Sequence, residues 1–197
     1  KIMNADKNEY KILTGDFNIA DINTSRGYYR QNGGTATVAR LLIGKNNSTA
    51  GYLTLSGGLF TDRDNNADTV VGGFSGQAST YGSVVIRGGA MEHYDNFQLG
   101  GGGLGVFEQS GGSFYHASGY PVFGRYTVGV GVGHLTGGSF TKSASELLIV
   151  GEAGTGVVTV AGTAAVTSGV PLSVGWAAGG LGVVNLTGGS LTVPKVQ

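Results

Sequence analysis

The feature that most constrains this chain is a glycine frame that recurs along its length. Six glycine doublets and one degenerate member mark the frame: Gly33-Gly34, Gly57-Gly58, Gly88-Gly89, Gly111-Gly112, Gly137-Gly138, Gly162-Thr163 and Gly188-Gly189. Another glycine precedes each of them by six residues, at Gly27, Gly51, Gly82, Gly105, Gly131, Gly156 and Gly182. Although glycine makes up 39 of the 197 residues, seven such coincidences would arise by chance about once in 10⁵. The chain is therefore predicted to be a repeat protein.

A second landmark, apolar-x-apolar-Gly, lies upstream of the glycine pairs. Its copies end at Gly44, Gly72, Gly100, Gly124, Gly151 and Gly175, and the first copy carries Ala20 instead of glycine. These positions give a period of roughly 26 residues, within the range of known repeat architectures. About seven repeats, or rungs, therefore cover residues 17–193.

Apolar and polar residues alternate with period two inside each repeat, which indicates strands rather than helices. The repeat at residues 51–72 predicts strands at 52–55, 59–61 and 70–71, with the glycine doublet turning the chain between the first two. The predicted fold class is all-β, a right-handed parallel β-helix (β-solenoid) of about seven rungs of roughly 26 residues, with three strands per rung. Residues 1–16 are expected to form an N-terminal cap or a segment donated to a neighbour, and residues 17–197 the solenoid.

Equivalent positions of successive rungs define columns of side chains that are expected to line the interior. One predicted column contains Ile19, Ile43, Val71, Leu99, Phe123, Val150 and Val174, and another contains Ala36, Phe60, Met91, Phe114, Phe140, Ala165 and Leu191. A further apolar column includes Gln31 and Gln109. Each of these glutamines is expected either to bond to the backbone or to face outward.

Composition and charge argue against several function classes. The formal net charge is zero and no basic patch stands out, so nucleic acid is not an expected partner. No apolar run approaches the ~20 residues of a membrane-spanning helix, so no membrane span is expected. The absence of cysteine excludes thiol catalysis, thiolate metal sites and disulfides.

The repeat resembles two kinds of bacterial surface protein. The stretches 51–61, 131–141, 156–166 and 182–193, together with 148–151 and 172–175, are similar to the repeats of autotransporter passengers and of glycine-rich, secreted bacterial β-solenoid proteins. This resemblance implies an extracellular or cell-surface location and an adhesive, matrix or fibre role. It is a resemblance of fold and carries no site residues with it.

The loop with the most acidic residues is a candidate calcium site. Asp62, Asp64, Asn66 and Asp68 place oxygen ligands at alternate positions, which suits a hard cation such as Ca²⁺. The EF-hand pattern fails, because Ala67 stands where glycine is needed. The alternative is a solvated polar loop with Asx turns. No other cofactor is expected.

Two histidines and a set of tyrosines are further candidates. His93 and His116 occupy the same repeat position on adjacent rungs, between Asp62 and Lys142, so their rings should lie about 5 Å apart. A metal or acid–base site is one interpretation and a surface ladder is the favoured one. Tyrosines suggest a face that binds sugars or partner chains, with packing in loops as the alternative; they are Tyr28, Tyr29, Tyr52, Tyr81, Tyr94, Tyr115, Tyr120 and Tyr126.

An enzyme is not expected. Pectate-lyase-like enzymes share the architecture, but they need clustered carboxylates and a basic residue on one face, whereas Arg87 and Arg125 are isolated. A polysaccharide lyase therefore stands third among the alternatives.

The two ends of the chain differ in charge. Only Glu152 and Lys195 are charged within residues 151–197, whereas residues 1–45 carry many charges. Because an uncovered, uncharged solenoid end is prone to association, the sequence predicts head-to-tail self-assembly as a subunit of an extracellular filament, sheath or surface layer. An adhesin or glycan-binding rod is the alternative function. The alternative explanation of the nearly uncharged C-terminal end is that further rungs follow residue 197.

Overall fold

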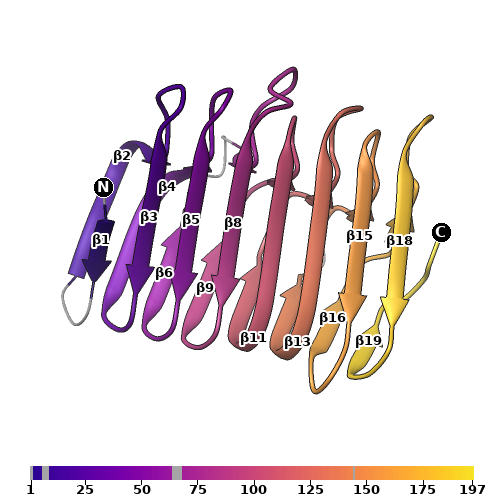
Figure 1. Cartoon of the computed structure of the whole chain (residues 1–197). Coiled ribbons are helices and arrows are strands. Elements are labelled where there is room, and N and C mark those ends of the chain that lie inside the picture. Colours follow the sequence, from indigo (N-terminus) through magenta and orange to yellow (C-terminus); the bar gives the residue numbers. More distant parts are fainter. Residues whose placement is uncertain (1, 6–8, 64–67, 144) are drawn as a thin grey trace.

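The computed structural model describes residues 2–5, 9–63, 68–143 and 145–197, and these residues form stacked strands without any helix (Figure 1). The strands are β1 (Ile2–Ala5), β2 (Glu9–Ile19), β3 (Arg26–Gln31), β4 (Thr35–Ile43), β5 (Ala50–Leu55), β6 (Leu59–Asp62), β7 (Thr69–Val71), β8 (Tyr81–Ile86), β9 (Ala90–His93), β10 (Phe97–Leu99), β11 (Leu104–His116), β12 (Pro121–Phe123), β13 (Val130–Lys142), β14 (Leu148–Val150), β15 (Thr155–Val160), β16 (Ala165–Ser168), β17 (Leu172–Val174), β18 (Leu181–Leu186) and β19 (Ser190–Thr192). Neighbouring rungs pair in parallel. The chain is a parallel β-solenoid of about seven turns, as predicted.

Three faces make up each turn. The first sheet consists of β1, β3, β5, β8, the first half of β11, the first half of β13, β15 and β18. The second contains the first halves of β2 and β4, then β6, β9, the second halves of β11 and β13, β16 and β19. The third contains the second halves of β2 and β4, then β7, β10, β12, β14 and β17.

The glycine frame lies in one line down the first sheet, as the sequence predicts. Strand pairing places Gly27 beside Gly51, and each later glycine of the set beside the next, through to Gly182. The reason is space: a Cβ on Gly131 would lie less than 3.0 Å from the backbone nitrogen of Gly124. Gly124 itself ends the third-sheet strand with φ = 77°, the left-handed region that glycine adopts most easily. The frame therefore lets the chain turn tightly back onto the first sheet.

The predicted columns form the core. Ile43, Val71 and Leu99 pair in register and are fully buried. The predicted column with Ala165 is wrong at that rung, because Val166 pairs with Phe140 and Leu191 and Ala165 faces outward. The turn around Gly162 is one residue longer than the other doublet turns, which moves the strand by one position and exchanges its two faces.

The two glutamines of the apolar column are buried and bond to the backbone, which confirms the first of the two expectations. Gln31 Nε2 donates to the carbonyls of Gly34 (3.1 Å) and Leu59 (3.0 Å). Gln109 Nε2 donates in the same way to Ser139 O at 2.9 Å. Each amide thus satisfies carbonyl groups at the corner between the first and second sheets.

The first 16 residues contribute strands that run in register with the solenoid. Ile2–Ala5 pairs with β3, and Glu9–Ile19 pairs with β4. The backbone of this segment therefore continues the first and second sheets by one further strand each.

Candidate functional site

A column of polar side chains is buried where the second-sheet strands end. In-register pairing stacks Asp62, His93, His116 and Lys142 on four consecutive rungs, preceded by Val38 and followed by Ser168. The four residues are between 0% and 2% exposed. The expected surface ladder is therefore wrong, because this strand position points into the core. The predicted ring spacing is confirmed: the His93 and His116 centroids are 5.1 Å apart, with 20° between the ring planes.

The polar side chains at the two ends of the column have hydrogen-bond or ion-pair partners, whereas the middle of the column has fewer. His93 Nε2 lies 3.5 Å from Asp62 Oδ2, and the hydroxyl of Thr69 donates to the same carboxylate oxygen. At the other end, Lys142 Nζ donates to the carbonyl of Ser145. Neither ring nitrogen of His116 has a hydrogen-bond partner among the described residues. The imidazole of His116 stacks on His93 and packs against the Phe114 ring.

Burial determines the protonation of the column. Desolvation lowers the pKa of His93 to about 3, and the positive charge of Lys142 adds to the effect. Desolvation, together with His93 and Lys142, holds the pKa of His116 well below its ordinary value. Desolvation also lowers the pKa of Lys142 to about 8. At neutral pH two uncharged imidazoles therefore separate the Asp62 side chain from the Lys142 ammonium group.

Replacement of Lys142 tests the cost of this buried charge. We expect Lys142→Met to be as stable as the wild type or more stable by about 1–2 kcal/mol at pH 7, because a thioether of similar length has no charge to desolvate. The unfolded lysine binds a proton up to about pH 10.5 and the folded one only up to about pH 8, so wild-type stability should rise between these pH values. Urea unfolding at pH 7, 8.5 and 10 measures both effects; a variant that keeps the alkaline rise would contradict this origin.

The two predicted calcium ligands that the structure describes, Asp62 and Asp68, have different hydrogen-bond partners. Asp62 belongs to the buried column, whereas Asp68 accepts hydrogen bonds from Asn96 Nδ2 (2.7 Å) and Gln98 Nε2. Asp64 and Asn66 lie outside the described residues. No cluster of three or more metal-binding side chains occurs in the described parts of the chain. The calcium site stays a prediction.

Three of the tyrosines form a ladder on the outer side of the first sheet. The rings of Tyr28 and Tyr52 are stacked, with centroids 4.7 Å apart and an interplanar angle of 6°, and Tyr81 follows at 5.3 Å and 43°. Tyr29 instead points inward and is buried in the core. His134, in β13, is exposed on the same outer side.

Comparison with protein-family models, curated proteins and solved structures found no match. The described residues contain no helix of the length and apolarity that crossing a membrane would require. The fold alone therefore assigns the class: a parallel β-solenoid repeat protein with a buried column of ionisable side chains.

Proposed function

We propose that this protein is a structural subunit of an extracellular or cell-surface assembly, built by end-to-end stacking of solenoids. The observation that carries the proposal is the C-terminal rim, defined as the outer edge of β18 and β19. Within the described residues no strand pairs with this edge. The backbone groups along it that point away from the preceding rung can accept another strand.

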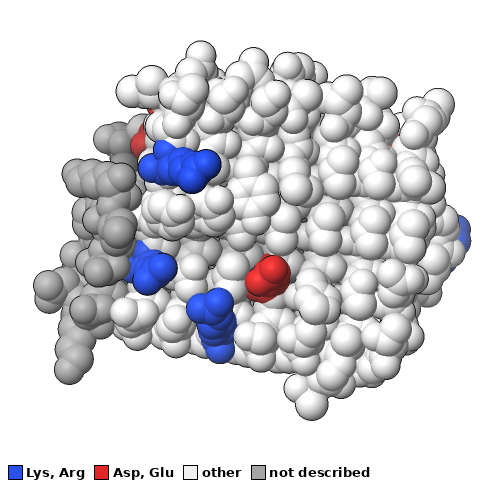
Figure 2. Space-filling model, in the orientation of Figure 1, with Lys and Arg blue, Asp and Glu red and all other residues white. Residues whose placement is uncertain are grey.

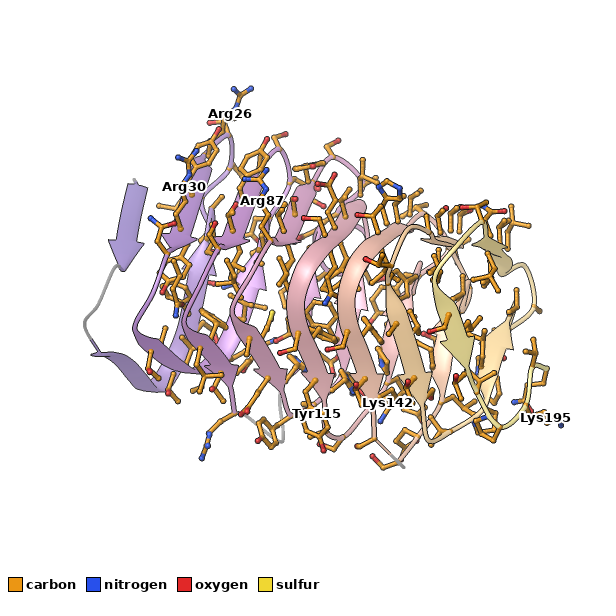
Figure 3. The ribbon with its side chains drawn as sticks, turned by 90° about the horizontal axis from the view of Figure 1, so that it is seen from below. Arg26, Arg30, Arg87, Tyr115, Lys142 and Lys195 are labelled. Atoms are coloured by element: carbon orange, nitrogen blue, oxygen red, sulfur yellow. The ribbon has the colours of Figure 1, made fainter. Side chains whose placement is uncertain are left out.

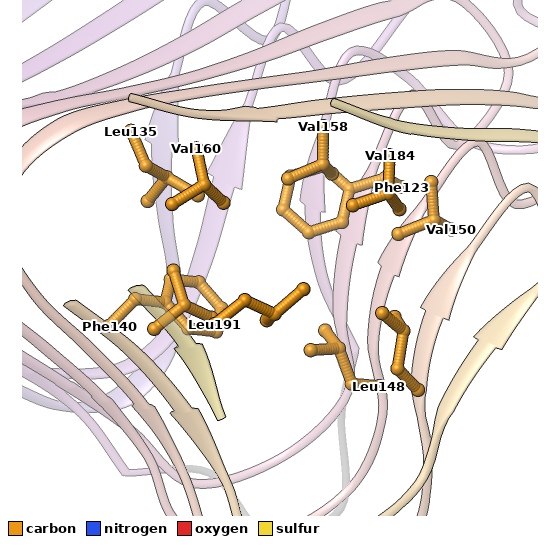
Figure 4. Close-up of a pocket in the computed structure, with 11 residues that line it drawn as sticks. Phe123, Leu135, Phe140, Leu148, Val150, Val158, Val160, Val184 and Leu191 are labelled. Atoms are coloured by element: carbon orange, nitrogen blue, oxygen red, sulfur yellow. The ribbon is translucent and has the colours of Figure 1, made fainter. Parts of the chain in front are cut away.

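The rim is apolar as well as unpaired. Leu181 and Leu186 are 57% and 56% exposed, and Trp176, in the turn before β18, is 49% exposed. Figure 4 shows the core behind this end, where Val158, Val184 and Leu191 lie around a hollow lined by apolar side chains. A further rung would bury this surface, whose transfer from water is worth roughly 25 cal/mol per Å².

A second copy of the same chain suits this rim because every rung has the same geometry. The line of glycines and the path through the three sheets repeat from Gly27 to Gly182. A rung of another copy therefore has the same cross-section as the rung that contains β18 and β19, and can stack on it. At the opposite end β1 presents a strand of the first sheet that pairs only with β3 among the described strands. Such a heterologous contact does not close on itself and therefore leads to filaments.

Leu186→Lys tests this mode of assembly. Leu186 belongs to an interior column, and a continued solenoid would bury the introduced ammonium group without a partner. We expect association of the variant to weaken by at least about 100-fold, while the isolated variant stays folded because the position is exposed. Val128→Lys is the matched control, since Val128 is 54% exposed in a turn remote from the rim.

Light scattering coupled to size-exclusion chromatography, with negative-stain microscopy, measures the outcome over a range of concentrations. Filaments or concentration-dependent oligomers in the wild type and in Val128→Lys, but not in Leu186→Lys, would support the proposal. A wild-type chain that stays monomeric at every concentration would overturn it, as would equal assembly of Leu186→Lys.

A further inference from the structure

The outer side of the first sheet carries a cationic patch at its N-terminal end. Arg26 and Arg30 project from β3, and Arg87 follows β8; all three are exposed. Figure 3 places these three side chains on one side of the solenoid, opposite Tyr115 and Lys142. Figure 2 shows the same face: basic side chains gather over the N-terminal rungs, and the surface over β15 and β18 is largely uncharged.

These arginines differ from Arg40 and Arg125, which form ion pairs, and from Arg63, whose guanidinium group lies over the Tyr94 ring. Arg40 lies 3.5 Å from Asp16, and Arg125 lies 3.6 Å from Glu152. Arg26, Arg30 and Arg87 form no ion pair with any described residue. Glu108 on β11 is exposed and bounds the patch on the C-terminal side. The patch thus keeps three guanidinium groups available for an anionic ligand.

The strand geometry fixes the spacing of the patch. Arg26 and Arg30 are four residues apart on one strand, which corresponds to about 13 Å between their Cα atoms. Arg30 pairs through Thr54 with Val85, two residues before Arg87, so Arg30 and Arg87 lie on rungs separated by about 10 Å. A ligand that meets all three must carry several negative charges spread over more than 10 Å, as a linear polyanion does.

The tyrosine ladder between the arginines indicates the rest of the ligand. Tyr52 lies between Tyr28, at 4.7 Å, and Tyr81, at 5.3 Å, so this stack covers both faces of the Tyr52 ring and one face of the Tyr28 ring. Thr54 and Ser56 add hydroxyl groups beside them. Nucleic-acid bases need an open ring face for stacking, whereas sugars can hydrogen-bond to hydroxyl groups and guanidinium groups.

We propose that this face, formed by Arg26, Arg30, Arg87 and the ladder of Tyr28, Tyr52 and Tyr81, binds an acidic polysaccharide. The arginines pair with carboxylate or sulfate groups of the chain, and the hydroxyl groups bind its sugar hydroxyls. The site lies on the side of the solenoid and goes beyond the proposed end-to-end assembly, since it leaves both rims free. An assembled filament would repeat it along its length and bind one polymer at many points.

Binding to immobilised polygalacturonate, measured with the whole chain by biolayer interferometry, tests the proposal. The double variant Arg30→Gln, Arg87→Gln should bind about 5- to 30-fold more weakly, because each exposed ion pair contributes modestly. The control Arg63→Gln, Lys195→Gln removes the same charge from exposed positions outside the patch and should bind as the wild type does. Tyr52→Phe keeps the stack and removes one hydroxyl, and should weaken binding less than the arginine variant.

Each outcome decides the proposal. The proposal is supported if binding weakens with salt, is absent with neutral dextran, and is weakened by the arginine variant but not by the control charge variant. Equal binding to dextran, equal loss in the control variant, tighter binding to single-stranded oligothymidine, or no binding to either polymer overturns it. Because polymer binding and self-association are measured separately, failure here leaves the proposal of end-to-end assembly standing or falling by its own test.

Discussion

Acidification from pH 6.5 to pH 4.5 should lower the free energy of unfolding by about 2 kcal/mol through His93 alone, and His116 should add to the loss. The unfolded imidazole binds a proton near pH 6.5, whereas folded His93 does so only near pH 3. Between these values the unfolded state holds the extra proton, so stability is present above pH 6.5 and is lost as the pH falls. Since whole domains are stable by only about 5–15 kcal/mol, this loss is a substantial fraction of the stability of an ordinary domain.

The double variant His93→Leu, His116→Leu isolates this effect. Leucine fills a similar volume, and His116 has no hydrogen-bond partner to lose among the described residues. We expect the variant to keep most of its stability at pH 7 and to show a much flatter dependence between pH 6.5 and pH 4.5. His134→Leu is the control, because His134 is exposed. Urea unfolding followed by circular dichroism at each pH measures the slope; an unchanged slope in the double variant would place the acid sensitivity elsewhere.

Gly131→Ala should lower the free energy of unfolding by about 3 kcal/mol or more. The new Cβ would lie less than 3.0 Å from the backbone nitrogen of Gly124. It would also lie less than 3.0 Å from the backbone oxygen of Leu99 on the preceding rung. The backbone of the two rungs would have to separate, because these close atoms belong to the backbone and not to a flexible side chain. The effect is therefore one of excluded volume rather than of backbone conformation, since Gly131 has an ordinary negative φ.

Gly179→Ala separates these two causes. Gly179 has φ = 84° and nothing within 4 Å of an added Cβ. Its substitution should cost only the strain of a left-handed residue, about 1 kcal/mol. Thermal unfolding of both variants gives the comparison. Similar losses in the two variants would mean that the glycine line does not act through close contact.

Much of the fold was predictable because it depends on local features that repeat. The alternation of apolar residues predicts the strands, and the regular spacing of Gly27, Gly51 and their equivalents predicts which strands stack. The glycine frame did not predict that Val166 rather than Ala165 points into the core. A single extra residue in a turn shifts every side chain of the next strand to the other face. Register is decided by how that turn packs on the rungs beside it.

The polar column marks the limit of sequence reasoning at the candidate site. Asp62, His93, His116 and Lys142 are polar, and polar residues near a turn usually indicate a solvated position. One signal could have shown otherwise: Val38 precedes them and Ser168 follows them at the same inward position. The burial of these four side chains depends on the neighbouring rungs and on the third sheet, which surround the column in the folded protein.

By itself, the sequence determined that this chain stacks: its glycine spacing and two-residue periodicity specify parallel coils, since only such coils place the glycines over one another. The tertiary structure decided which polar groups lose contact with water and which arginines and tyrosines gather on one face. Those properties depend on contacts between residues about 25 positions apart, and a side chain's protonation and accessibility follow from what surrounds it in space rather than in sequence.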